Sequence, residues 1–282
     1  MKLLSPRTFS VLLACFFSLQ SAAESLMLGV HEGTSSSSDA IFMKAKYTPL
    51  ADYLAAASGE KVVLETPKVL SIVARNLENK RYDVMLVRPS HLSARAMRDQ
   101  GYRLLAVAAG EAKVHFIVRG DAKMKTLRDI KGLSIAMPDP LSYPTNLGLA
   151  LMREEGINAS QEKIQYMDRQ DAVGLMVNSG MADVGVVMSY SKAGADWQKS
   201  GGRFLHSKGR LPYWSVIASP NVSQQTFERL QKALLALNNP GKSRNLLSNL
   251  DIAGFNEGKE QPYLNMLTWV EGKNIARLAR NP

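Results

Sequence analysis

Hydrophobic and polar positions follow two patterns along this chain. Short continuous apolar runs predict buried strands, and apolar residues three or four positions apart predict helices. We predict strands at 26–30, 62–64, 84–87, 104–108, 114–118, 134–137, 163–166, 184–187, 203–206 and 216–218. We predict helices at 47–57, from Thr66-Pro67, from Pro89, and at 144–155, 168–179, 191–199, 223–238 and 263–279. This repeated order favours an α/β fold, with sheets flanked by helices.

Two breaks in composition divide the pattern into two lobes. They are Ala109–Ala112 and Ser207–Arg210, where the chain would cross between lobes. Lobe one would then comprise 24–109 plus 209–282, and lobe two 110–208. Sheets of this class bind ligands at the carboxyl ends of their strands. The natural ligand site is therefore a cleft between the lobes.

The N-terminus has the pattern of a secretory signal peptide over residues 1–23. Lys2 and Arg7 precede an apolar run at 9–19, and Ser21-Ala22-Ala23 offers a cleavage site. This predicts export from the cytoplasm. An alternative is lipidation at Cys15, since Leu12-Leu13-Ala14-Cys15 resembles a lipoprotein box. Cys15 is the only cysteine, so the mature chain would have no disulfide framework and no thiol nucleophile.

The charge balance is basic, at +10 for the whole chain and +8 without Lys2 and Arg7. The basic residues are spread out and form no dense run with interleaved aromatic residues, which argues against nucleic acid as a partner. A basic solvated surface or an anionic ligand remains. The four histidines lack metal-ligand spacing, and no catalytic motif is present. We expect a binding protein with no cofactor and no metal, rather than an enzyme.

One strand-to-helix turn, at 137–148, is the leading candidate for ligand binding. Such a turn presents free backbone N–H groups and the positive end of a helix dipole, which suit an anion. Here Ser142 and Tyr143 offer hydroxyls, and Thr145 and Asn146 offer N–H groups. The alternative for Ser142 is a plain helix N-cap that touches no ligand.

Further candidates follow other predicted strands. Arg88 ends a strand, where it would pair bidentately with an anionic ligand. The alternatives are a surface arginine or a structural ion pair. The other candidates are Thr34 and Ser35 after the first strand, Ser90 and His91 at a helix start, and Tyr190 near the mouth of the second lobe. The alternatives are an exposed loop for Thr34 and Ser35, a helix cap for Ser90 and a solvated helix-start residue for His91. At the second crossing, Tyr213 and Trp214 would stack on a ligand or a cation, or pack the hinge.

Five segments resemble the periplasmic binding proteins of phosphate, phosphite and phosphonate transporters, the phosphonate-binding group of type 2 solute-binding proteins. The segments are 47–54 followed by Gly59, 82–90, 118–121 followed by 127–132, 139–142, and 180–185. The resemblance covers nearly all of the mature chain. It implies the two-lobed type 2 periplasmic binding protein fold, each lobe a mixed sheet flanked by helices.

The chain also departs from the family pattern. The family turn reads Asp-Pro-x-Ser-x-Ser-Gly, and here Pro144 and Thr145 replace its second serine and its glycine. Residues 168–171 lack the histidine that the family often carries at a helix start. The tyrosine of its Gly-Pro-x-x-Tyr segment is lost, while Arg88 and His91 are gained. The phosphonate motif is therefore incomplete.

The resemblance implies a monomeric periplasmic solute-binding protein that delivers its ligand to an ABC permease. We expect a small anionic or zwitterionic ligand of the phosphonate, phosphate-ester or sulfonate type. The alternative is a periplasmic sensing module that signals to a membrane receptor, such as a sensor kinase or cyclase. Membrane association would be through the partner, unless Cys15 is lipidated.

Overall fold

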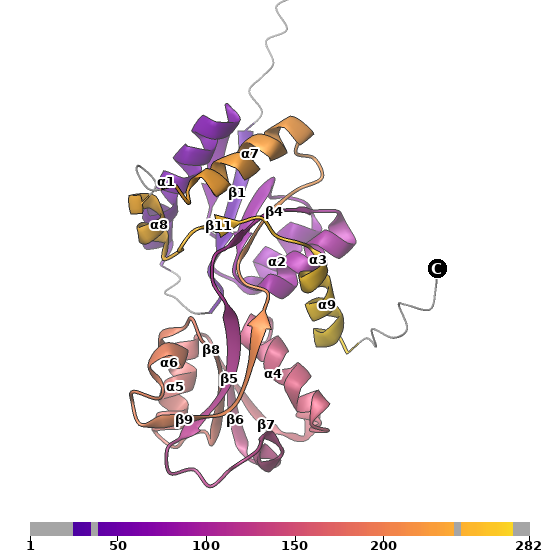
Figure 1. Cartoon of the computed structure of the whole chain (residues 1–282). Helices are drawn as coiled ribbons and strands as arrows, with labels where there is room; N and C mark the ends of the chain where they lie inside the picture. The colour runs from indigo at the N-terminus through magenta and orange to yellow at the C-terminus, as the bar shows by residue number, and fades with distance from the viewer. Residues whose placement is uncertain (1–24, 35–38, 240–243, 273–282) are drawn as a thin grey trace, which may run out of the picture.

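The computed structural model describes residues 25–34, 39–239 and 244–272, which form two lobes (Figure 1). The strands are β1 (Ser25–His31), β2 (Lys61–Glu65), β3 (Val84–Val87), β4 (Arg103–Ala108), β5 (Ala112–Arg119), β6 (Ser134–Pro138), β7 (Lys163–Met167), β8 (Val184–Met188), β9 (Gly202–Leu211), β10 (Ser215–Ala218) and β11 (Phe255–Asn256). The α-helices are α1 (Ala40–Ser58), α2 (Leu70–Glu78), α3 (Ser90–Gln100), α4 (Tyr143–Glu154), α5 (Gln170–Asn178), α6 (Lys192–Asp196), α7 (Gln224–Ala236), α8 (Arg244–Leu250) and α9 (Gln261–Val270). Two short 3₁₀ helices, η1 (Leu127–Ile130) and η2 (Ala159–Gln161), complete the described elements.

Each lobe contains one mixed sheet. The first lobe has the strand order β11-β4-β10-β3-β1-β2, and the second has the order β7-β6-β8-β5-β9. Strands β1, β2 and β3 run parallel, while β10 is antiparallel to both of its neighbours. In the second lobe, β6 runs parallel to β7 and β8, and β5 is antiparallel to β8 and β9. The predicted α/β class with two mixed, helix-flanked sheets is confirmed.

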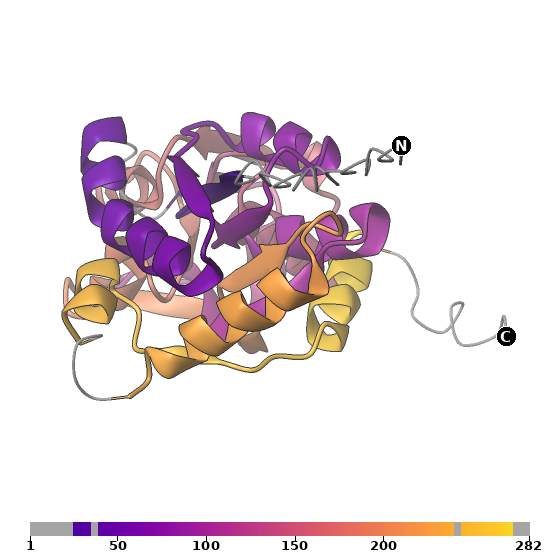
Figure 2. The same ribbon diagram turned by 90° about the horizontal axis from the view of Figure 1, so that it is seen from above.

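Helices cover both faces of the first sheet because its central strand is apolar on both sides. Along β3, Val84 and Leu86 join the cluster formed with α1, α7 and α8, whereas Met85 and Val87 join the cluster formed with α2, α3 and α9. This split follows from the alternation of side chains along a strand. Helices α1 and α7 lie side by side over one face (Figure 2).

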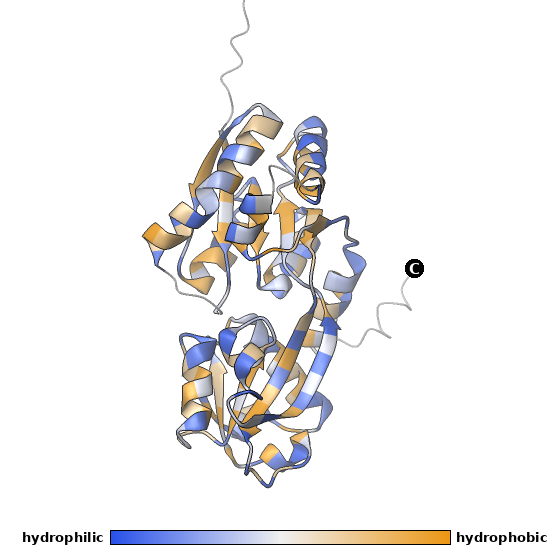
Figure 3. Cartoon of the chain, turned by 60° about the vertical axis from the view of Figure 1, so that its left-hand side comes forward, coloured by the Kyte–Doolittle hydropathy of each residue, from blue (hydrophilic) through white to orange (hydrophobic). Residues whose placement is uncertain are grey.

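The second sheet is also covered on both faces. Phe116 and Val186 pack with apolar residues of α4, and Ile117 and Val187 pack with α5 and Trp197 on the other face. Apolar residues accordingly concentrate along the strands of both lobes (Figure 3). The larger cluster is continuous from the α3 side of the first lobe to the α4 side of the second.

The chain passes between the lobes at 109–111, between β4 and β5, and at 212–214, between β9 and β10. We placed the second crossing at 207–210, but these residues continue β9 as far as Leu211, which pairs with Ala112. Gly110 has a φ of 153°, and a Cβ there would lie 2.5 Å from the Tyr213 ring. The glycine therefore lets Tyr213 pack against the first crossing. The lobe ranges 24–109 plus 209–282 and 110–208 remain a proposal.

Three helix predictions need correction. Helix α1 begins at Ala40 rather than at residue 47, because Asp39 caps it by accepting a hydrogen bond from the Phe42 N–H. Helix α2 begins at Leu70, so Thr66 and Pro67 do not start it. In the C-terminal region the chain forms α8 and β11, which we did not predict, before α9.

The predicted signal peptide at 1–23, Cys15 within it, and the end of the last predicted helix lie outside the described residues. Among the described helices, none has the length and apolar character needed to cross a membrane. Within the same residues, no cluster of three or more His, Cys, Asp or Glu side chains is arranged to hold a metal ion.

Candidate functional site

Residues that follow the carboxyl ends of strands from both lobes meet at the lobe boundary. The first lobe contributes Thr34, Arg88, Ser90 and His91, which follow β1 and β3. The second lobe contributes Ser142, Tyr143, Thr145, Asn146 and Tyr190, which follow β6 and β8. Each of these predicted site residues lies in the described part of the chain, whereas Ser35 lies outside it.

Arg88 is held among aromatic rings at this boundary. Its backbone N–H donates to the His31 carbonyl (3.0 Å), which continues the pairing of β3 with β1. The guanidinium carbon lies 3.5 Å from the centre of the Trp214 ring and 5.0 Å from that of Tyr190. Aromatic faces attract a guanidinium through their negative electrostatic potential. Trp214 belongs to the second crossing and Tyr190 to the second lobe, so Arg88 contacts both.

Tyr190 extends this aromatic group. Its ring centre lies 5.7 Å from that of Tyr213, and Tyr213 in turn lies 6.1 Å from Trp214. Burial raises the pKa of the Tyr190 hydroxyl, and the nearby Arg88 charge opposes that shift. The phenol is therefore a neutral donor at physiological pH, a form suited to an oxyanion.

His91 connects the lobes from the start of α3. Its ring is 2% exposed and stacks on Tyr143 of the second lobe, with ring centres 5.7 Å apart. Burial, assisted by the Arg95 charge, lowers the His91 pKa to about 3, and a hydrogen bond with the Leu141 backbone only partly offsets this. The imidazole is therefore neutral at pH 7. Its Nδ1 atom is buried and finds no hydrogen-bond partner among the described residues.

Ser90 and Tyr143 attach both lobes to the second crossing. The Ser90 hydroxyl contacts the carbonyls of Pro212 and Tyr213, both at 3.0 Å. The Tyr143 hydroxyl donates to the Pro212 carbonyl (3.2 Å). Burial raises the pKa of Tyr143 well above its ordinary value, so this hydroxyl keeps its proton. The two side chains hold segment 212–214 against the site.

The turn before α4 uses its own polar groups. The Ser142 hydroxyl accepts from the Thr145 N–H (3.4 Å), the expected N-cap arrangement. The Thr145 hydroxyl donates to the Pro138 carbonyl (3.0 Å), and the Asn146 amide donates to the Ser142 carbonyl (2.8 Å). Pro144 fits in the first helical turn, as predicted. These side chains shape the turn in this structure, and a ligand role for them remains a prediction.

Thr34 forms a direct bridge between the lobes. Its carbonyl accepts from the Gln170 N–H (3.1 Å), and its hydroxyl accepts from the Gln170 side-chain amide (3.3 Å). The Gln170 side-chain oxygen accepts in turn from the Met188 N–H (2.6 Å). Gln170 starts α5 in the stretch where the family often has histidine, and it is 1% exposed.

A buried polar cluster lies beneath the first-lobe side of the site. Glu32 is 4% exposed, accepts from the Tyr47 hydroxyl, and forms an ion pair with Lys46 at 2.9 Å. His31 Nδ1 accepts from the Gly33 N–H (2.9 Å), and burial lowers the His31 pKa to about 4. These contacts fix the loop that carries Thr34.

Sequence reasoning missed two residues and left a third open. Gln170 and Glu32 carry no motif, and their burial follows only from the meeting of distant segments. For Trp214, stacking on a ligand, stacking on a cation and packing of the hinge were left open. In the structure it stacks on a cation, Arg88, and its Nε1 atom is buried without a partner in the described residues.

Two mixed sheets in separate lobes, with polar side chains of both lobes meeting at their boundary, are the features of the type 2 periplasmic binding proteins. Solved structures agree. XAC2383 from Xanthomonas citri bound to ATP matches with a TM-score of 0.74 and 17% identity, covering 88% of this chain and 98% of that one. PhnD1 from Prochlorococcus marinus in complex with methylphosphonate matches with a TM-score of 0.71 and 14% identity, covering 89% and 99%. The periplasmic aliphatic sulphonate binding protein SsuA from Escherichia coli matches with a TM-score of 0.58 and 14% identity, covering 92% and 94%.

Membership of a family is shown by the match to a family model, rather than by these structures of low sequence identity. The model for the periplasmic phosphonate substrate-binding proteins of ABC transporters matches residues 33–263. The chain belongs to this family of periplasmic binding proteins, which are not enzymes. A search of curated proteins found no match.

Proposed function

We propose that this protein captures a small anionic or zwitterionic solute of the phosphonate, phosphate-ester or sulfonate type between its lobes. One observation carries the proposal: the buried guanidinium of Arg88 lies at the lobe boundary between Trp214 and the second-lobe residue Tyr190. A guanidinium forms paired hydrogen bonds with the oxygens of phosphonate and carboxylate groups. Tyr190 adds a neutral hydroxyl from the opposite lobe.

Ligand capture would proceed by hinge closure. The contacts between Thr34 and Gln170 and between His91 and the Leu141–Tyr143 segment connect the two lobes directly. A ligand that touches Arg88 and Tyr190 at once binds the closed form better than the open form. It therefore shifts the population towards closure by the difference in affinity.

The proposed ligand class is broad and covers several kinds of oxyanion. Pro144 removes a hydroxyl and a backbone N–H from the position of the second serine in the family turn, so phosphonate specificity does not transfer directly. The similar structures were solved with or named for methylphosphonate, aliphatic sulphonate and ATP. These ligands share oxyanion groups, which supports the class but selects no member of it.

The family favours transport over the alternative of a sensing module. Its members are the periplasmic components of ABC transporters, so the closed, loaded protein would dock on a permease. We propose the periplasm as its location, a monomer as its working state, and the signal peptide at 1–23 as its route of export.

A thermal-shift screen tests the proposal, since a ligand of the folded state raises its melting temperature. The probes are methylphosphonate, inorganic phosphate, ethanesulfonate and ATP, with choline and a neutral sugar as contrasts. We expect at least one oxyanion to raise the melting temperature of the wild type and of Arg81→Gln, which changes an exposed ion pair with Glu65. Arg88→Gln should abolish that response. A response to choline or the sugar alone would overturn the anionic class.

A further inference from the structure

We propose that the end of α9 is a brace that stabilises the closed orientation of the lobes without touching the ligand. The α9 brace consists of Trp269, Val270 and Glu271 on the first-lobe side and of Arg153 and Glu154 on the second. It connects the lobes at a place distinct from the two chain crossings and from the contacts of Thr34 and His91 at the site.

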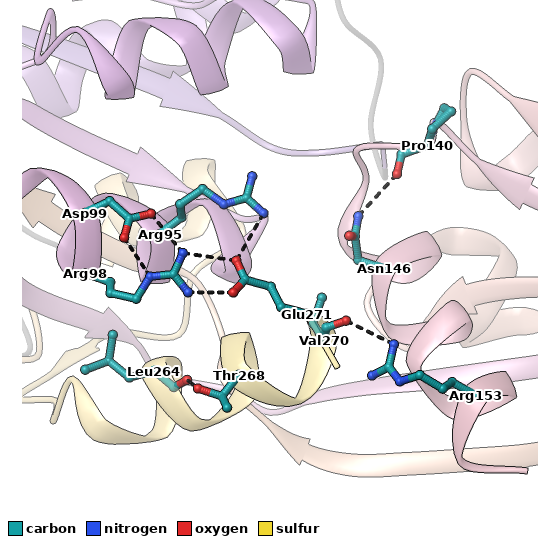
Figure 4. Close-up of polar contacts among 10 residues, drawn as sticks. All are labelled: Arg95, Arg98, Asp99, Pro140, Asn146, Arg153, Leu264, Thr268, Val270 and Glu271. Atoms are coloured by element: carbon teal, nitrogen blue, oxygen red, sulfur yellow. Dashed lines mark hydrogen bonds and ion pairs between the residues drawn. The ribbon is translucent and has the colours of Figure 1, made fainter. Parts of the chain in front are cut away.

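Helix α9 belongs to the first lobe. It packs along α3, and its Tyr263 hydroxyl donates to the Tyr213 carbonyl (2.7 Å). At its end, the Glu271 carboxylate accepts from the Arg98 guanidinium at 2.6 and 3.1 Å, and Arg95 lies 3.7 Å away. Figure 4 shows Glu271 facing both guanidinium groups of α3. Two charge-assisted bonds to one carboxylate fix the position of this helix end.

The same helix end contacts the second lobe. The Arg153 guanidinium of α4 donates to the Trp269 carbonyl. It also donates to the Val270 carbonyl at 3.3 Å (Figure 4). Both carbonyls lie in the last turn of α9, where the Trp269 carbonyl also accepts from the Gly272 N–H (3.1 Å). A cation there meets the negative end of the helix dipole.

The Trp269 side chain adds two contacts of its own. Its Nε1–H donates to the Glu154 carboxylate (2.7 Å), and the Lys208 ammonium of β9 lies 4.9 Å from its ring centre. Residues of α4 and β9 therefore surround the last turn of α9. All of these second-lobe groups would move relative to α9 if the lobes rotated.

The brace and the cleft contacts depend on one rigid helix. At its N-terminal end, α4 places Tyr143 against His91 and the second crossing. At its C-terminal end, Arg153 and Glu154 hold α9. A helix of 12 residues is about 18 Å long and moves as a unit. The orientation that buries the site is therefore the orientation in which the brace forms, and the brace contributes to closure before any ligand binds.

The test measures lobe separation without a ligand, so it stands apart from the proposed function. Spin labels would be attached at Ile41→Cys and Leu175→Cys in the full chain carrying Cys15→Ser. Both positions are exposed, at 84% and 68%, and they follow Thr34 and Gln170 on opposite lobes. Pulsed electron–electron distance measurements then report the open and closed populations.

Arg153→Gln should shift the distances towards longer values than in the wild type. The open-to-closed ratio should rise by roughly two- to fivefold, which is the effect expected when one exposed charged contact is lost. Arg128→Gln is the matched control, because Arg128 pairs with Glu155 within the second lobe (2.8 Å). If Arg153→Gln does not fold, Trp269→Phe removes the bond to Glu154 and weakens the contact with Lys208, and it should shift the distances in the same direction. Distances that match the control, or that become shorter, would overturn the proposal.

Discussion

Gln170 of the second lobe makes two hydrogen bonds to Thr34 of the first, one from its backbone N–H (3.1 Å) and one from its side-chain amide (3.3 Å). The same side chain accepts from the Met188 N–H. Gln170 thus links Thr34 of the first lobe to Met188 at the end of β8, the central strand of the second-lobe sheet. The contact is available only in an orientation that brings the two lobes together.

Replacing this residue should weaken closure. Gln170→Leu keeps the volume but leaves the Met188 N–H and the Thr34 hydroxyl without their partner, and buried groups of this kind cost about 1–3 kcal/mol each. We expect a lower melting temperature and a Kd for the best oxyanion of the thermal-shift screen that is at least about tenfold weaker. Gln165→Leu on exposed β7 is the matched control and should change neither. Unchanged affinity in Gln170→Leu would remove this bridge from the closing mechanism.

Trp214 should report ligand binding through its fluorescence. The chain has three tryptophans, and only Trp214 stacks on Arg88. An oxyanion at Arg88 changes the charge beside this ring, so we expect a ligand-dependent change in emission that Trp214→Phe removes. The smaller ring should also weaken binding by roughly fivefold, since the cation–π attraction is strongest for tryptophan.

The control for that experiment is Trp197→Phe. Trp197 is buried in the second lobe, where it donates to the Val118 carbonyl (3.0 Å) and packs in the cluster of Ile117 and Val187. This variant should keep the ligand-dependent signal. A signal that disappears with Trp197 and persists without Trp214 would contradict the placement of the ligand at Arg88.

Stability should fall as the pH is lowered through the histidine range. Burial lowers the pKa of His91 to about 3, and those of His31 and His115 to about 4, from an ordinary value of 6.5. Because the unfolded chain takes up these protons first, the contribution of these histidines to stability is fully present above pH 6.5 and decreases as the pH falls towards 4. From pH 7 to pH 5, His91 alone should account for about 2 kcal/mol.

Urea denaturation at pH 7 and pH 5 measures this effect. The loss of stability on acidification should be smaller in His91→Gln than in the wild type, whatever the absolute stability of the variant. Equal losses in the two proteins would mean that His91 is protonated in the folded state as readily as in the unfolded chain.

The first crossing should tolerate no side chain at residue 110. A Cβ in Gly110→Ala would lie 2.5 Å from the Tyr213 ring, in a backbone conformation that L-residues rarely adopt. Strain and overpacking together predict a loss of roughly 2–4 kcal/mol in the free energy of unfolding. Gly132→Ala also has a positive φ (78°) but meets no atom within 4 Å, so calorimetry should show a smaller loss there.

The sequence was sufficient for most of the sheets and for part of the site. Runs such as Val84–Val87 are apolar at every position, which predicts a strand buried on both faces, and the structure has it at the same residues. The start of α1 was missed because its first seven residues mix polar and apolar positions without a clear face. The capping role of Ser142 was foreseen as an alternative from its place before a helix.

The partners of the site residues were beyond reach of the sequence. Nothing local indicates that Arg88 lies on Trp214, 126 positions later, or that Gln170 meets Thr34. These contacts follow from the return of the chain through β10 and from the relative orientation of two sheets. Both the return of the chain and the orientation of the sheets depend on tertiary packing. The sequence therefore predicts where a strand ends better than it predicts which residues contact that end.

The central claim is that an oxyanion binds between the lobes at Arg88. A crystal structure of the protein grown with the best oxyanion of the screen tests this most directly. We predict that oxygen atoms of the anion lie within hydrogen-bonding distance of the Arg88 guanidinium, with Tyr190 of the other lobe in contact with the same ligand. An anion bound away from Arg88, or held by one lobe alone, would contradict the account.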